Sequence, residues 1–228
     1  SNPANLGLDP DSSWMILAGR AVTTSSPTQF AAIQNQGPLA TGIIYRNGPD
    51  LSSWTTLSTG LGLPIDRNLS LGVHLGWQLP EGSENNFVSW DLGMSWRPLP
   101  WLGVSSVARN VGIKDSSVLD LRTEYGGGLG LRPWEDRIFF GVDALWEETA
   151  DGFSEPMPKI QGSLRLQLVD WIQVRVSGDT EGGVAAGLQF FKGEAGLGAH
   201  GALSSSDATP EALVYASSYP SERSKLSG

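Results

Sequence analysis

An alternation of apolar and polar residues runs along most of this chain and constrains its fold more than any other feature. From Leu69 to Leu79 the odd-numbered positions hold Leu, Val or Trp, and the even-numbered positions hold Ser, Gly, His or Gln. Comparable runs lie at 88–97, 119–132, 138–146, 160–168 and 172–176. A period of two places successive side chains on opposite faces of a strand. The chain is therefore predicted to be all-β, with one apolar and one polar face on each strand.

Composition excludes several classes of function. The chain has no Cys and only two histidines, His74 and His200, which excludes disulfides, cysteine nucleophiles and multi-histidine metal sites. No catalytic constellation is visible, so we expect neither an enzyme nor a cofactor. The formal net charge of -9 gives no basic surface for nucleic acid. No apolar run approaches the ~20 residues of a spanning helix, and no signal sequence is visible, so the chain is interpreted as a mature or excised segment.

Two architectures share this alternation: a soluble sandwich or lipocalin-like barrel, and a transmembrane antiparallel β-barrel. The alternating runs reach roughly ten residues, which a tilted strand needs to cross a bilayer, whereas globular strands cluster near 5–6. Short turns such as Val169–Trp171 alternate with longer polar connections such as Ser204–Pro210, which is typical of outer-membrane barrels. Both features favour the membrane barrel. Tryptophans near the expected strand ends predict an interfacial aromatic girdle of Trp54, Trp77, Trp90, Trp101, Trp134, Trp146 and Trp171.

A parity argument predicts the number of strands. If the tight turns face the periplasm, Leu39–Asn47 must ascend, and a periplasmic amino terminus then requires two strands before it. Ser13–Thr23 and Thr28–Asn35 meet that need, and Glu211–Tyr219 forms the last descending strand. The total is about fourteen, an even number as single-chain bacterial barrels have. We therefore predict a lumen segment at 1–12, a barrel at 13–219 and a flexible periplasmic tail or linker at 220–228.

Two stretches resemble a known family. The opening Ser1–Gly7, with its Asn-Pro-Ala sequence, is similar to the amino-terminal element of the long-chain fatty-acid transporter (FadL) family and of related PorV-like outer-membrane proteins. Trp90–Gly93, Trp96–Val104 and Val107–Asn110 are similar to the mid-barrel hairpin of PorV-like chains. The resemblance implies a bacterial outer-membrane barrel. Because the amino-terminal segment is a hatch in the lumen of FadL-type transporters, it also implies a plug role for Asn2, Pro3 and Ala4.

Two functions follow as hypotheses. The first is a FadL-like or PorV-like barrel that passes or holds a small hydrophobic or amphipathic ligand. The second is a non-transporting barrel that anchors a larger assembly of envelope proteins. Either would contact outer-membrane lipid or lipopolysaccharide and would have both termini in the periplasm. The short external loops argue against the long hydrophobic groove of the transporters, whereas inward-facing Gly and Ser residues leave room for a plug or a ligand.

Charged residues on the predicted inner face form the candidate site. The tight turn at Val169–Trp171 places Arg165 opposite Arg175, and two guanidinium groups repel each other unless an anion or a carboxylate lies between them. Either Asp143 or Asp179 neutralises them, or the pair binds an anionic group. The same pairing across turns predicts two further juxtapositions, Asp91 near Arg109 and Glu124 near Asp143.

Overall fold

The computed structural model describes residues 3–8, 12–21, 29–47, 53–81, 86–112, 122–134, 137–149, 152–153, 158–203 and 211–218. A short helix, α1 (Asn5–Leu8), precedes the strands. The strands are β1 (Ser13–Ala21), β2 (Gln29–Gln36), β3 (Leu39–Arg46), β4 (Trp54–Pro64), β5 (Leu69–Pro80), β6 (Phe87–Leu99), β7 (Leu102–Val111), β8 (Glu124–Leu131), β9 (Ile138–Thr149), β10 (Gly152–Phe153), β11 (Lys159–Val169), β12 (Ile172–Asp179), β13 (Val184–Lys192), β14 (Ala195–Leu203) and β15 (Glu211–Ser218). The described helix is too short to cross a membrane.

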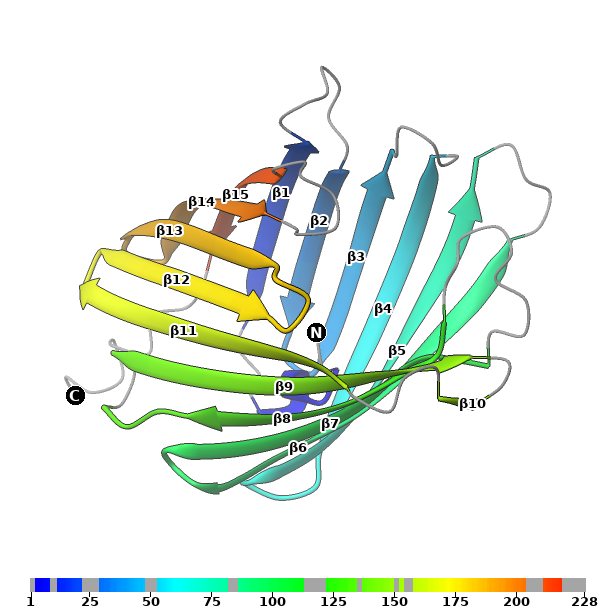
Figure 1. Ribbon diagram of the computed structural model, residues 1–228, viewed down its shortest axis with the longest axis horizontal. Coiled ribbons are helices and arrows are strands. Elements are labelled where there is room, and N and C mark those ends of the chain that lie inside the picture. Colours follow the sequence, from blue (N-terminus) through cyan, green and yellow to red (C-terminus); the bar gives the residue numbers. More distant parts are fainter. Residues whose placement is uncertain are drawn as a thin grey trace.

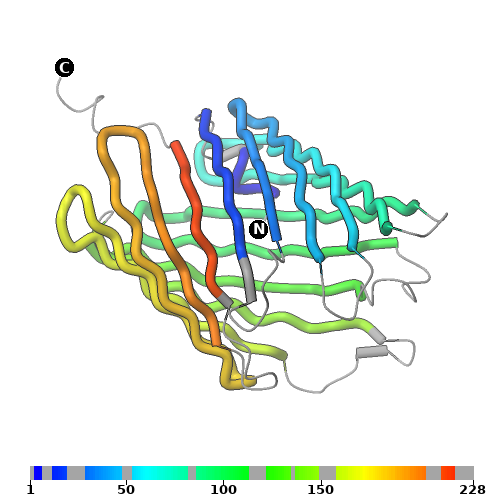
Figure 2. The backbone as a smooth tube through the Cα atoms, turned by 90° about the horizontal axis from the view of Figure 1, so that it is seen from above, coloured from blue at the N-terminus to red at the C-terminus, as the bar shows by residue number. Residues whose placement is uncertain are grey.

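The strands form one closed antiparallel barrel (Figure 1). Each long strand pairs with its sequence neighbours, and β1 closes the ring by pairing with β15 from Trp14↔Ser218 to Ala21↔Glu211. One of the fifteen strands, the two-residue β10, pairs only with the end of β9. The other fourteen strands form the wall. Figure 2 shows β15, in red, beside β1, in blue, where the barrel closes. The predicted count of fourteen is confirmed, including the two strands that parity placed before Leu39.

The two ends of the barrel differ in their connections. At the short-turn end the strands are joined through positions 37–38, 65–68, 100–101, 132–137, 170–171 and 193–194. At the opposite, loop end most connections are longer; the exceptions are 81–86, which is as long as 132–137, and 180–183. β1 begins and β15 ends at the short-turn end, so the described chain enters and leaves the wall on the same side. The predicted tail at 220–228 lies outside the described residues.

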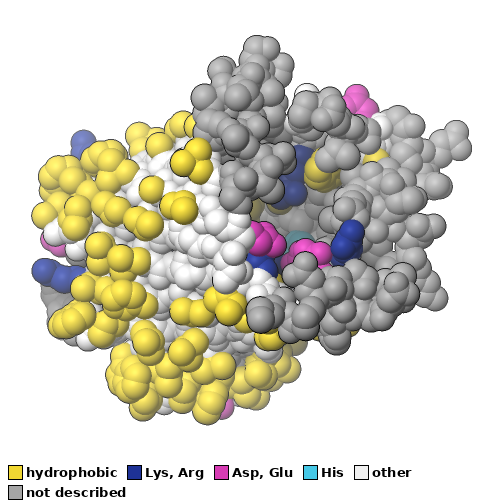
Figure 3. All heavy atoms as spheres, viewed as in Figure 1, with side chains coloured by type: hydrophobic (Ala, Val, Ile, Leu, Met, Phe, Trp, Pro, Cys, Tyr) yellow, Lys and Arg dark blue, Asp and Glu magenta, His cyan; other side chains and the backbone are white. Residues whose placement is uncertain are grey.

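The wall carries large apolar side chains on its outer face and small or polar ones on its inner face. On β6, Leu92 is 49% exposed, and Trp90 and Trp96 beside it are also exposed, whereas Ser89 is 3% exposed. The buried polar or charged side chains among the described residues are Thr56, Ser70, Gln78, Ser89, Ser95, Gln189 and Ser217. Figure 3 shows hydrophobic side chains over the outer wall and charged side chains within a hollow. This distribution is the reverse of that in a water-soluble protein and suits a wall surrounded by lipid.

Candidate functional site

Residues 3–8 lie inside the barrel near the short-turn end. Ala4 is completely buried, and the Leu6 backbone N–H donates to the Pro3 carbonyl at 3.2 Å. The helix α1 contacts β4, β5 and β6. The amino-terminal segment therefore occupies part of the lumen. Of the three predicted plug residues, Pro3 and Ala4 lie there, and Asn2 lies outside the described residues.

Glycines on the inner face leave the space in which this segment packs. Gly72 faces Ala4 so closely that a methyl group on Gly72 would overlap the Ala4 backbone. A methyl group on Gly60 would lie 3.3 Å from Leu6 Cδ1. On β6 the Ser95 hydroxyl donates a hydrogen bond to Asn5 Oδ1 at 2.8 Å. The wall is thus shaped to the segment, because larger residues at these positions would exclude it.

Asp91 lies in the lumen between two partners. His74 Nδ1 is 2.9 Å from Asp91 Oδ2, and the Asn110 backbone N–H donates to Asp91 Oδ1 at 3.0 Å. Asn110 has a φ of 54° at a register shift between β6 and β7. This bulge turns the Asn110 N–H toward Asp91, and Arg109, which was expected near Asp91, forms no ion pair with it in the described part of the chain.

Arg109 instead forms an ion pair with Glu124 on the neighbouring strand β8, with 3.1 Å between Arg109 Nη1 and Glu124 Oε2. The expected juxtaposition of Glu124 with Asp143 is wrong. Glu124 lies opposite Glu147, and Asp143 lies opposite Gly128. The physical reason is the connection between β8 and β9: pairing begins only at Leu131↔Phe140, and the resulting register places Asp143 away from Glu124.

Further ion pairs lie toward the loop end. Arg122 Nη1 is 3.6 Å from Glu147 Oε2. Lys159 Nζ is 3.6 Å from Asp179 Oδ2 and also contacts the carboxylate of Glu181. These contacts pair acidic with basic side chains at this end of the lumen.

Arg165 and Arg175 lie directly opposite each other on β11 and β12, as the turn predicted. Arg175 also lies beside Gly187, and Gly187 lies beside His200 on the next strand. Asp179, one of the two expected neutralising groups, pairs with Lys159 and accepts the Gly183 and Glu181 backbone N–H groups. The other, Asp143, lies opposite Gly128 and Gln161. Across the described ranges, no carboxylate lies within salt-bridge distance of Arg175.

Tryptophans mark both rims of the outer wall. Trp77, Trp90 and Trp146 are exposed toward the loop end, and Trp101, Trp134 and Trp171 are exposed at the short-turn end. Trp14 and Trp96 are exposed as well; their positions early in β1 and late in β6 could have placed them in the predicted set. Trp54 differs, because it shares the inner face of β4 with buried Thr56, and the Arg46 guanidinium lies 5.7 Å from its ring centroid.

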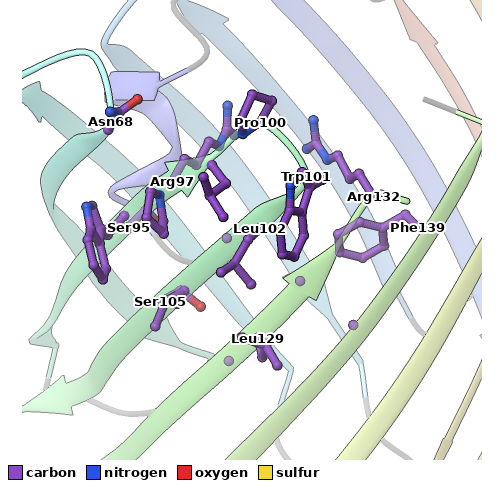
Figure 4. Close-up of a pocket in the computed structure, with 18 of the residues that line it drawn as sticks. Asn68, Ser95, Arg97, Pro100, Trp101, Leu102, Ser105, Leu129, Arg132 and Phe139 are labelled. Atoms are coloured by element: carbon purple, nitrogen blue, oxygen red, sulfur yellow. The ribbon is translucent and has the colours of Figure 1, made fainter. Parts of the chain in front are cut away.

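A cavity of about 580 Å³ opens at the short-turn end beside Asn5 of α1 (Figure 4). Its lining includes glycines and serines of β7, β8 and β9 and three arginines, Arg67, Arg97 and Arg132. The alternating runs 88–97 and 119–132 end at Arg97 and Arg132, but alternation does not show that these two residues share a cavity with Arg67, which lies in a turn. The signal that could have found them is the recurrence of Arg beside Pro at 97–98 and 132–133, next to glycine-rich strands.

Within the described part of the chain, no group of three or more His, Asp or Glu side chains is arranged to hold a metal ion.

The similarity of this chain to known proteins lies in its fold. No protein-family model matches the chain, and no curated protein sequence matches it.

Solved structures of outer-membrane barrels are similar to it. The outer membrane protein Omp33 of Acinetobacter baumannii has a TM-score of 0.59 at 11% identity, covering 93% of this chain and 99% of that chain. A mutant porin of Rhodopseudomonas blastica has a TM-score of 0.52 at 8% identity, covering 91% of this chain and 98% of that chain. A second mutant of the same porin has a TM-score of 0.51 at 8% identity, with the same coverage. The chain thus has the fold of an outer-membrane β-barrel.

Proposed function

We propose that this chain is a channel of the bacterial outer membrane whose lumen is narrowed by its own amino-terminal segment. The observation that carries the proposal is the position of residues 3–8 against Gly72 and Ser95 within a barrel that has an apolar outer face. A fourteen-stranded barrel is too wide for its backbone to fill, so side chains, a plug or water must occupy it. The segment occupies one side of the lumen, and water fills the remainder.

The lumen lining favours small polar or amphipathic solutes. Inner-face positions hold Ser, Gly, Gln and charged side chains, among them the His74–Asp91 and Arg109–Glu124 pairs. A purely hydrophobic ligand would gain little from such a surface, because these groups would lose water without gaining partners. The resemblance to the FadL and PorV-like families supports a hatch role for the amino-terminal segment more than it supports fatty-acid transport.

The proposed orientation places the short-turn end and both termini in the periplasm, since outer-membrane barrels have short periplasmic turns and longer external loops. The exposed tryptophans at both rims would then lie at the two lipid interfaces. In this arrangement lipid or lipopolysaccharide contacts the outer face.

Conductance in planar lipid bilayers tests the proposal. We expect the full chain to give a small conductance and a chain lacking residues 1–12 to give a larger one. Removal of residues 220–228 is the matched control, since it shortens the other terminus by a similar length and should leave the conductance unchanged. If neither the full chain nor the shortened chain conducts, the channel proposal fails and the alternative, a barrel that anchors other envelope proteins, is favoured.

A further inference from the structure

The cavity at the short-turn end concentrates positive charge. Arg97 ends the inner face of β6, Arg67 lies in the turn between β4 and β5, and Arg132 follows β8. Figure 4 shows Arg97 and Arg132 extending toward the same side of the wall. The turn also brings Arg67 close to Arg97, because the Arg97 backbone N–H donates to the Asn68 carbonyl at 2.7 Å. Two strand connections and the end of β6 therefore place guanidinium groups in the lining of one cavity.

Two of these charges, those of Arg67 and Arg132, have no acidic partner within salt-bridge distance in the described part of the chain. The carboxylate nearest in sequence to Arg67, Asp66, accepts the Asn68 and Leu69 backbone N–H groups through Oδ1. Arg132 lies with its guanidinium carbon 5.9 Å from the ring centroid of Phe139. This aromatic contact orients Arg132 without cancelling its charge.

The lining of the cavity also includes one carboxylate. Asp143 lies four residues beyond Phe139 on β9, which corresponds to about 13 Å along a strand. Between these two positions, Gly128, Gly130 and Gly141 leave room on the inner face for the Phe139 ring and the Asp143 carboxylate, which lie directly over them. The lining therefore combines guanidinium groups at the short-turn end with one carboxylate, Asp143, farther along β9.

We propose that this cavity binds a small hydroxylated organic anion, such as a sugar phosphate. Guanidinium groups recognise carboxylate and phosphate oxygens through paired N–H donors, so the anionic group of the solute binds at Arg67 and Arg132, with Arg97 adding to the positive charge of the lining. The hydroxyl groups of the solute donate hydrogen bonds to the Asp143 carboxylate, which also lines the cavity. A volume of about 580 Å³ exceeds that of a bare oxyanion and suits a small organic solute. The site goes beyond the proposed channel, because a barrel that does not conduct could hold it equally well.

Calorimetric titration of the full chain in detergent micelles tests this site without requiring conduction. Three probes distinguish binding of the anionic group from binding of the hydroxyl groups: glucose 6-phosphate, inorganic phosphate and glucose. We expect glucose 6-phosphate to bind saturably and more tightly than phosphate, and glucose to show no binding. Absence of saturable binding of glucose 6-phosphate, or equal binding of glucose, would overturn the proposal whatever the channel measurements give.

Variants assign the binding to the cavity. Arg132→Gln should weaken binding of glucose 6-phosphate about tenfold, as loss of a charge-assisted contact does. Arg67→Gln, in an exposed turn, provides a second test if Arg132→Gln fails to fold by circular dichroism. Asp143→Asn should weaken the binding of glucose 6-phosphate but leave the affinity for inorganic phosphate unchanged. Arg122→Gln removes one positive charge near the loop end and should have no effect; an equal loss of affinity there would show that net charge, not the cavity, controls binding.

Discussion

Ala4 and Gly72 fit together only because Gly72 lacks a side chain. Ala4 is completely buried, and a methyl group on Gly72 would overlap its backbone. Gly72→Ala should therefore displace the amino-terminal segment, at a cost to docking of roughly 1–3 kcal/mol, as overpacking has in well-packed sites. A single Cys in place of Ala4 reports on this docking, because the chain has no other Cys. The Cys should be protected from a bulky water-soluble thiol reagent, and Gly72→Ala should increase its labelling about tenfold or more.

The matched control is Gly103→Ala. Gly103 faces the same lumen, but a methyl group there would meet nothing within 4 Å. Labelling of the Cys at position 4 should stay low in that variant. Rapid labelling of this Cys when both Gly72 and Gly103 are kept would contradict the docked position. Equal labelling in the two alanine variants would show that the segment does not pack against Gly72.

Arg175 should contribute to the ion selectivity of the open barrel. It faces the lumen opposite Arg165 and, within the described residues, has no carboxylate partner. Arg175→Leu should lower anion permeability relative to cation permeability while leaving the barrel folded. The reversal potential in a salt gradient, measured on the chain without residues 1–12, reports this ratio. An unchanged reversal potential would place Arg175 outside the path of ions.

Asp91 should stabilise the folded barrel more than the exposed acidic groups do. Its two oxygens accept the Asn110 N–H and contact His74, so Asp91→Leu leaves two polar groups without an acceptor. We expect a loss of about 1–3 kcal/mol in the free energy of unfolding, measured by urea titration in lipid vesicles. Glu147→Gln is the control, because its side chain is 52% exposed and its pair with Arg122 is 3.6 Å long. An effect at Glu147 as large as that at Asp91 would contradict this assignment.

Alternation and parity predicted the wall well because both depend on strand geometry alone. A shift of one residue would turn every side chain of a strand to the wrong face, so the apolar pattern specifies which residues face outward. The opposition of Arg165 and Arg175 was also predictable, since the connection between their strands is only two residues long, at 170–171.

Features that depend on irregular backbone were not predictable in this way. The bulge at Asn110 gave Asp91 a backbone partner, and the register set by the connection at 132–137 separated Glu124 from Asp143. The arginine-lined cavity combines turns that are distant in sequence with a helix that enters the lumen. Trp54 lies at the start of β4, where a tryptophan is equally compatible with an outward girdle and with an inward stack on Arg46.

The most direct test of the whole account compares arginine at two adjacent positions of β12. Val176 is 42% exposed on the outer face, and Ser177 faces the lumen between Ser163 and Ala185. If lipid surrounds the wall and water fills the lumen, Val176→Arg should cost about 2–4 kcal/mol in urea-dependent folding into lipid vesicles, whereas Ser177→Arg should cost far less. Equal costs at the two positions, or a larger cost at Ser177, would contradict the membrane barrel and the channel inferred from it.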